Sequence, residues 1–165
     1  MARRLIFRVD RAAQAILVPA LVCVDLITKT WAQAAEATTQ GPTPILPFLS
    51  LVLAYNPGLT FGNFFGLARH PFISALLSAS IIAALLVWIW KEANILRRFF
   101  IAFALAGALG NAIDRSINAM VTDFMQIHFG GNSMFVVNFA DLFIVIGIIG
   151  LVVTTKGSSS GRTPK

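Results

Sequence analysis

Four long apolar stretches, separated by more polar segments, are the main feature of the chain. They run from about Ala12 to Trp31, from Phe72 to Trp90, from about Phe99 to Ile117 and from Val136 to Val153. Each is close to the ~20 apolar residues with which an α-helix crosses the hydrocarbon core of a bilayer. The pattern therefore predicts an all-α integral membrane protein with four transmembrane helices.

The longer connections, residues 34–70 and 118–135, are predicted to lie on the same side of the membrane. Residues 34–70 are rich in proline and glycine, which argues against a helix. Within them Phe48 to Tyr55 is apolar and β-friendly, and predicts a short strand on the membrane surface before a tight turn at Asn56-Pro57-Gly58. The second connection has a turn signal at Gly130-Gly131-Asn132.

Composition supports the membrane interpretation and excludes other classes. Only 12% of the 165 residues are charged and 57% are hydrophobic, and the mean hydropathy is +0.79. A soluble domain carries about a quarter charged residues, so ordinary soluble folds and solvated disorder are excluded. We expect one membrane-embedded domain over residues 1–155, followed by a disordered cytoplasmic tail at 156–165, which is rich in serine and glycine.

The positive charge of the chain, +6 net, is concentrated in alternate connections. Basic residues mark the cytoplasmic side of membrane proteins, which predicts that both termini face the cytoplasm. No basic face exists apart from these segments, so nucleic acid is not an expected partner. The residues that set this orientation are Arg3, Arg4, Arg8 and Arg11 before the first stretch, Lys91, Arg97 and Arg98 between the second and third, and Lys156, Arg162 and Lys165 after the fourth.

The first apolar stretch has an alternative interpretation as a cleaved signal peptide. It has a basic start, an apolar middle and, at Ala32-Gln33-Ala34, residues that resemble a cleavage site. Asp25 and Lys29 interrupt the apolar block just before that site, where charged residues are unfavourable. We therefore favour a retained transmembrane helix.

Acidic residues gather near the outer side of the predicted spans. A charge inside a bilayer costs roughly 2.5–3.5 kcal/mol on insertion scales, so several acids at a similar depth indicate a functional site. They are Asp25, Asp114, Asp123 and Asp141.

Two of these acids have partners nearby in the sequence. Asp25 and Lys29 are one helical turn apart and can pair on one face, which favours a structural ion pair over a chemical role. Asp114 has Asn111 one turn earlier and Arg115 beside it. This pattern favours a structural network around Asp114.

Asp123 and Asp141 have no Lys, Arg or His within four residues on either side. Desolvation drives an unpaired carboxylate toward its neutral form, and two carboxylates that share a site hold one proton between them, as in an aspartic protease. One of them then takes a proton from water, and the other hydrogen-bonds the scissile carbonyl oxygen. The alternative is a buried Asp141 that caps a helix and an Asp123 that is solvated in a loop.

A metal site is not expected. Neither His70 nor His128 has a cluster of ligands around it, and we expect His70 at the membrane interface and His128 in a solvated loop. The single cysteine, Cys23, excludes a disulfide framework and a cysteine-based metal site.

Five short motifs occur in order along the chain: Asp25-Leu-Ile-Thr-Lys29, Asn56-Pro-Gly-Leu-Thr-Phe61, Gly110-Asn111-Ala-Ile-Asp114-Arg115, Val121-Thr-Asp123-Phe124 and Asn138-Phe-Ala-Asp141. Together, in a layout with four spans, they resemble the lipoprotein signal peptidase (signal peptidase II) family. The resemblance extends from the first apolar stretch through the fourth. Leu59-Thr60 stands where small alanines are common in the family, and Thr122 stands where an aliphatic residue is common.

The resemblance implies an aspartyl endopeptidase of the bacterial inner membrane, with its active site toward the periplasmic face. Such an enzyme removes the signal peptide from prolipoproteins whose cysteine carries a diacylglyceryl group. It implies four membrane helices plus a small extracytoplasmic β-cradle and a partly helical loop, which residues 34–70 and 118–135 would supply.

The resemblance also implies the roles of individual residues. The catalytic pair would be Asp123 and Asp141, in agreement with the choice made from local charge partners. We expect no cofactor, a monomer, and diacylglyceryl prolipoproteins and membrane lipids as partners. The substrate-binding residues would be Asn56, Gly58, Asn111, Arg115 and Asn138, supported by Asp25, Lys29 and Asp114.

Two other function classes stay open from the residues alone. A proton-coupled transporter also uses intramembrane acids, but it favours acids near the bilayer midplane and inverted repeats, and we see no internal repeat. A non-catalytic subunit would use its acids to pair with basic groups of other chains. Only a peptidase would release a signal peptide from a prolipoprotein.

Overall fold

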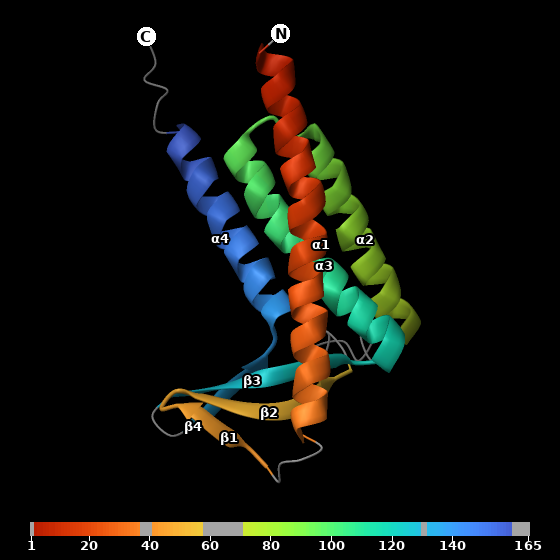
Figure 1. Cartoon of the computed structure of the whole chain (residues 1–165), viewed down its shortest axis with the longest axis vertical. Helices are drawn as coiled ribbons and strands as arrows, with labels where there is room; N and C mark the ends of the chain where they lie inside the picture. Colours follow the sequence, from red (N-terminus) through yellow and green to blue (C-terminus); the bar gives the residue numbers. More distant parts are fainter. Residues whose placement is uncertain (1, 37–40, 58–70, 130–131, 160–165) are drawn as a thin grey trace.

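The computed structural model describes residues 2–36, 41–57, 71–129 and 132–159 as a helical bundle that stands on a small sheet (Figure 1). Both ends of the described chain lie at the end of the bundle away from the sheet. The helices are α1 (Ala2–Glu36), α2 (Pro71–Lys91), α3 (Ile95–Asn118) and α4 (Phe139–Ser159), and the strands are β1 (Thr43–Leu46), β2 (Leu49–Asn56), β3 (Val121–Phe129) and β4 (Asn132–Val137).

Helix α3 is the centre of the bundle and packs against α1, α2 and α4. Its small residues Ala102, Ala106 and Gly110, spaced at four-residue intervals, are buried as a packing face. On the facing side of α4, a Cβ at Gly147 would lie 2.7 Å from the backbone nitrogen of Ala104. Small residues on both helices thus permit the close approach that packing in lipid requires.

The outer faces of the helices are apolar, as expected for contact with lipid. Ile27, Phe72, Trp90, Ile149 and Val153 are all more than half exposed. Three helices are long and apolar enough to cross a membrane, within Ala12–Ala35, Phe72–Lys91 and Ile95–Asn118, and α4 has a shorter apolar part at Phe139–Thr155. The protein is therefore a multi-pass membrane protein, and crossing by α4 stays a prediction.

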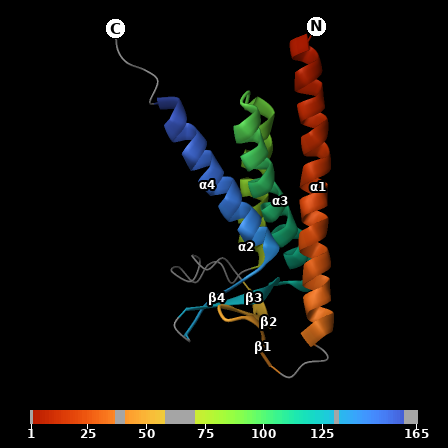
Figure 2. The same ribbon diagram turned by 60° about the vertical axis from the view of Figure 1, so that its left-hand side comes forward.

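The sheet is antiparallel in the order β1-β2-β3-β4 and lies against the end of the bundle where α1 ends (Figure 2). The strand predicted at Phe48–Tyr55 is confirmed as β2, which pairs with β3 so that Ala54 is opposite Asp123. Strand β1 was not predicted from the pattern. The predicted outer segment 118–135 is occupied mainly by β3 and the start of β4; the partly helical loop stays a prediction, because residues 58–70 lie outside the described part of the chain.

Several predicted boundaries shift. The fourth apolar stretch was predicted to begin a helix at Val136, but Val136 and Val137 belong to β4 and α4 begins at Phe139. Helix α4 continues to Ser159, so the start of the segment expected as a disordered tail at 156–165 is helical. Gly58, His70 and the turn residues Gly130 and Gly131 lie outside the described residues.

Candidate functional site

The first turn of α4 holds Asp141 in a fixed orientation. Asn138 precedes the helix, and its Oδ1 accepts a hydrogen bond from the backbone N–H of Asp141 at 3.0 Å. In return, Asp141 Oδ2 accepts from the backbone N–H of Asn138 at 3.3 Å. This reciprocal arrangement is a capping box. The capping role suspected for Asp141 is therefore present, although Asp141 is only partly buried.

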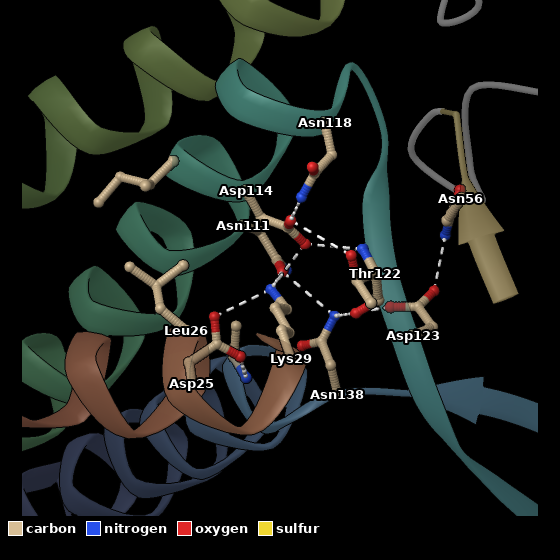
Figure 3. A network of polar contacts seen from close by, with 12 residues as sticks. Asp25, Leu26, Lys29, Asn56, Asn111, Asp114, Asn118, Thr122, Asp123 and Asn138 are labelled. Carbon is tan, nitrogen blue, oxygen red and sulfur yellow. Dashed lines mark hydrogen bonds and ion pairs between the residues drawn. The ribbon is translucent and has the colours of Figure 1, made fainter. Parts of the chain in front are cut away.

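Asp123 lies in β3 and is 4% exposed, so it is not the solvated loop residue of the alternative interpretation. Its Oδ1 accepts from Asn138 Nδ2 at 2.6 Å, and its Oδ2 accepts from Asn56 Nδ2 at 3.3 Å (Figure 3). Burial, and then the negative charge of Asp141, raise the pKa of Asp123 to about 6, against the lowering effect of the two amide hydrogen bonds. Asp123 is therefore held closer to its neutral form than an ordinary aspartate.

Asn138 connects the two acids. It is completely buried, and its side-chain nitrogen contacts Asp123 while its backbone N–H contacts Asp141. Asn111 on α3 completes the connection, because its Nδ2 donates to Asp141 Oδ1 at 2.9 Å and its Oδ1 lies 3.2 Å from Asn138 Nδ2. The carboxyl groups on β3 and α4 thus accept from different N–H groups, two of which belong to the same residue, Asn138, and burial drives Asp123 toward its neutral form.

Asp114 fixes β3 at Thr122, one residue before Asp123. Helix α3 ends at Asn118, and its C-cap Ala119 has a left-handed φ of 60° that turns the chain toward β3. There Asp114 Oδ2 accepts from the backbone N–H of Thr122 at 2.7 Å, and the Thr122 hydroxyl lies 3.3 Å from Asp114 Oδ1. Asp114 does lie in a structural network, but its contacts are with Thr122, Asn118 and Lys29 rather than with the expected Asn111 and Arg115, which contact Asp141 and Ser78.

Sequence reasoning missed two residues of this network, Thr122 and Gln33. The Gln33 side chain near the end of α1 donates to the Thr122 hydroxyl at 3.0 Å and so ties α1 to β3. Thr122 is fully buried. The available signal was its departure from the aliphatic residue common at this position, since a buried hydroxyl needs a partner.

Lys29 is the buried cation of the site, and it is 2% exposed. Its Nζ lies 2.9 Å from Asp25 Oδ2 and 3.3 Å from Asp114 Oδ2, and it donates to Asn111 Oδ1 at 2.8 Å. The predicted pairing of Asp25 with Lys29 is confirmed. Asp25 Oδ1 also accepts from the backbone N–H of Ala140 at 2.9 Å, so it joins α1 to the first turn of α4.

Of the other predicted site residues, Asn56 contacts an acid of the pair, whereas Arg115 contacts a serine on α2. Asn56 is at the end of β2 and reaches Asp123 directly. Arg115 points toward α2, where its guanidinium donates to Ser78 Oγ at 3.3 Å. His128 was expected in a solvated loop, but it lies in β3 and its ring nitrogen hydrogen-bonds Ser50 Oγ at 2.8 Å. Among the residues that the structure describes, no cluster of His, Cys, Asp or Glu could hold a metal ion.

An apolar hollow of about 340 Å³ opens beside the network, between α2, α3 and α4. Asn111 and Arg115 are on its wall, so the hollow reaches the side chains that contact Asp141 and Ser78. The rest of its lining is apolar apart from Ser78 itself. The residues are Ser78, Ile81, Leu85, Ala104, Ala108, Asn111, Arg115, Ile144 and Ile148.

Comparison with known proteins gives consistent matches over most of the chain. A family model described as signal peptidase (SPase) II matches residues 17–156. A protein named lipoprotein signal peptidase from Pelagibacter ubique is 36% identical over 151 residues, which cover 90% of each chain. A protein of the same name from Methylorubrum extorquens is 34% identical over 137 residues, or 81% of this chain and 79% of the other.

Two solved structures are similar in fold, and both are described as bacterial membrane enzymes studied by the in meso method. One superimposes with a TM-score of 0.80 at 26% identity and covers 93% of each chain. The other has a TM-score of 0.74 at 26% identity and covers 87% of this chain and 92% of the other. The arrangement of the bundle and sheet is therefore shared with membrane enzymes of known structure.

Proposed function

The chain belongs to the signal peptidase II family, and we propose that Asp123 and Asp141 are the catalytic pair of an intramembrane aspartyl endopeptidase. Family membership makes the protein a membrane protease that removes signal peptides from prolipoproteins. The observation that carries the aspartyl assignment is the shared contact through Asn138, which links a buried acid on β3 to a partly exposed acid on α4. The other acids whose side chains are described, Asp25, Glu92 and Asp114, each pair with a basic residue.

In the proposed mechanism the two acids have different tasks. Asp141 is the ionised member, because it accepts hydrogen bonds from Asn111 and from the N-terminus of α4, where negative charge is favourable. It takes a proton from water, and the resulting hydroxide attacks the scissile carbonyl carbon. Asp123 holds the shared proton and donates a hydrogen bond to the carbonyl oxygen as that oxygen becomes negative. Asp141 then delivers its proton to the leaving nitrogen, which breaks the peptide bond.

The hollow between α2, α3 and α4 fits the apolar part of the substrate. A signal peptide is an apolar helix and must be met within the bilayer, and a hollow of this size is in the range of ligand pockets. Arg115 and Asn111 at its wall can hydrogen-bond an extended peptide backbone where water is scarce. The proposed substrate is a prolipoprotein with a diacylglyceryl group on the cysteine after the cut, processed at the periplasmic face of the bacterial inner membrane, with both termini of the enzyme in the cytoplasm.

The function is tested by cleavage of a defined precursor. Purified protein in detergent should release the signal peptide from a diacylglyceryl-modified prolipoprotein, and it should do so in the presence of a metal chelator and without nucleotide. The matched control is the same precursor without the lipid on its cysteine, which should be cleaved far more slowly. Equal cleavage of both precursors would contradict the proposed substrate, and no cleavage of either would contradict the proposed activity.

Cleavage should fall as the pH rises through about 6, because the proton on Asp123 is then lost. Burial and the charge of Asp141 raise the pKa of Asp123 to this value, so its protonated form is complete well below it and is lost above it. The value of kcat/KM, which reports the free enzyme, should decline about tenfold per pH unit on this alkaline limb. A series of initial rates at low substrate concentration measures it.

Asn56→Ala gives a sharper check on the same proton. The Asn56 amide donates to Asp123, and Lys29 and Asn138 act in the same direction, each holding the pKa of Asp123 down. Removing the Asn56 amide should move the alkaline limb to higher pH, whatever it does to the maximal rate. An alkaline limb that stays in place would show that the proton in question is not on Asp123.

A further inference from the structure

We infer that the chain has a second binding site, for an anionic phospholipid, at the end of the bundle away from the sheet. The site is an apolar hollow between α1, α2 and α3 with the buried guanidinium of Arg98 in its wall. Its two polar residues, Gln14 and Arg98, lie on α1 and in the first turn of α3, whereas the acids lie on β3 and in the first turn of α4. The inference does not depend on the proposed peptidase mechanism.

The hollow has a volume of about 360 Å³ and its lining is apolar except for two polar side chains. Those two are Gln14 on α1 and Arg98 in the first turn of α3, and the Arg98 Nη2 donates to Gln14 Oε1 at 2.6 Å. Val18, Leu86 and Leu105 are among the apolar residues that complete the wall. A hollow of this kind can hold a hydrocarbon chain, and Arg98 offers one cationic group to the headgroup at the end of that chain.

The charge of Arg98 has no counter-ion among the residues whose side chains are described. Arg98 is 3% exposed, and its Nε is buried without a hydrogen-bond partner. The neighbouring Arg97 pairs with Glu92 at 3.3 Å, whereas no described acid pairs with Arg98. A guanidinium has five donor N–H groups and stays charged in proteins, and a buried charge without a partner is costly. An anion in the hollow would satisfy both the charge and the free donor.

A phospholipid is the occupant that matches both halves of the site. Its phosphate can accept two hydrogen bonds from the fork of one guanidinium, and its acyl chain can fill the apolar wall. The hollow also lies at the end of the bundle where Lys91, Arg97 and Arg98 are found. Basic pockets between transmembrane helices bind anionic lipid headgroups in this way. A free phosphate ion would satisfy only the guanidinium and leave the apolar wall unfilled.

The test measures lipid binding to the delipidated full-length protein. Native mass spectrometry detects the bound lipid, and thermal unfolding in detergent reports the stabilisation. The probes are dioleoylphosphatidylglycerol, dioleoylphosphatidylcholine and inorganic phosphate. We expect phosphatidylglycerol to bind and stabilise the protein more than either other probe. Arg98→Gln should weaken its apparent affinity by about tenfold or more, as the loss of a buried charge-assisted hydrogen bond does. Arg97→Gln is the matched control, since it removes the same charge from a paired and more exposed neighbour.

Two further variants keep the test decisive if Arg98→Gln folds poorly. Ala15→Phe adds bulk to the wall of the hollow without touching the charge, and it should also weaken phosphatidylglycerol binding. Asp10→Asn tests the acid four residues before Gln14 on α1, whose side chain lies outside the described residues; it should leave binding unchanged. Equal effects of Arg98→Gln and Arg97→Gln, equal stabilisation by phosphate and by phosphatidylglycerol, or binding that appears only in Asp10→Asn would each overturn the proposal.

Discussion

The variants Asp123→Asn and Asp141→Asn should each release the signal peptide about 10²–10⁴-fold more slowly, which is the usual contribution of a positioned proton-transfer group. Asparagine has nearly the same shape as aspartate and can still accept from Asn138, so the fold should survive. It cannot take a proton from water or hold the shared proton. The measurement is single-turnover release from a diacylglyceryl-modified precursor, with thermal unfolding of each variant measured alongside.

The matched control for these substitutions is Glu92→Gln, which makes the same acid-to-amide change in the connection between α2 and α3. Glu92 contacts Arg97 and Asn94 and is far from the acid pair in the bundle, so release should be unaffected. The double variant of Asp123 and Asp141 should be no slower than either single variant, because groups that act as a unit are not additive. If one single variant kept a substantial part of the activity, the two acids would not form a catalytic pair.

The largest loss of stability should follow from Lys29→Met. Lys29 is almost completely buried and its ammonium is within 3.3 Å of both Asp25 and Asp114. Methionine fills a similar volume but leaves these buried carboxylates without a cation, and breaking a buried ion pair from one side costs about 3–5 kcal/mol. The free energy of unfolding should fall by that amount, measured by thermal unfolding in detergent with tryptophan fluorescence as the signal.

Lys91→Met is the control for this experiment, because Lys91 is exposed at the end of α2 and its loss should change stability by less than about 0.5 kcal/mol. Asp25→Asn completes the series. It removes one of the two acids around Lys29. The free energy of unfolding should fall clearly, whereas the rate of release per folded molecule should change less. A fully stable Asp25→Asn variant with no turnover would instead give Asp25 a part in the chemistry.

The helices and the strand at Phe48–Tyr55 could be predicted from the sequence because their signals are local. Phe72 to Trp90 is predominantly apolar and has no charged residue, and the helix found there, α2, extends it by one residue at each end. The start of α4 could not be read from hydrophobicity, since Val136 and Val137 are as apolar as the helix that follows. It is set instead by the capping box of Asn138 and Asp141. Strand β1 escaped prediction because a short strand with a proline depends on its partner β2 for its hydrogen bonds.

The sequence also indicated which acids would be paired and which would not. Asp25 has a basic residue one turn away, and that spacing was sufficient to predict its ion pair. The way in which Asp123 and Asp141 are joined could not be predicted, because it depends on the side chain of Asn138 being turned toward β3 by the cap of α4. The link from Gln33 to Thr122 joins residues 89 positions apart and needs the assembled bundle. Spacing reports neighbours on one helix, and it carries no information on neighbours brought together by folding.

The position of α4 after the other three helices has a consequence for biogenesis. Asp123 and the anchors on α1 and α3 emerge from the ribosome before Asn138 and Asp141, which belong to the start of α4. A nascent chain that has inserted only its first three helices therefore has one acid of the proposed pair and lacks the residue that connects it to the other. The proposed pair can therefore form only after α4 has been made and has joined the bundle.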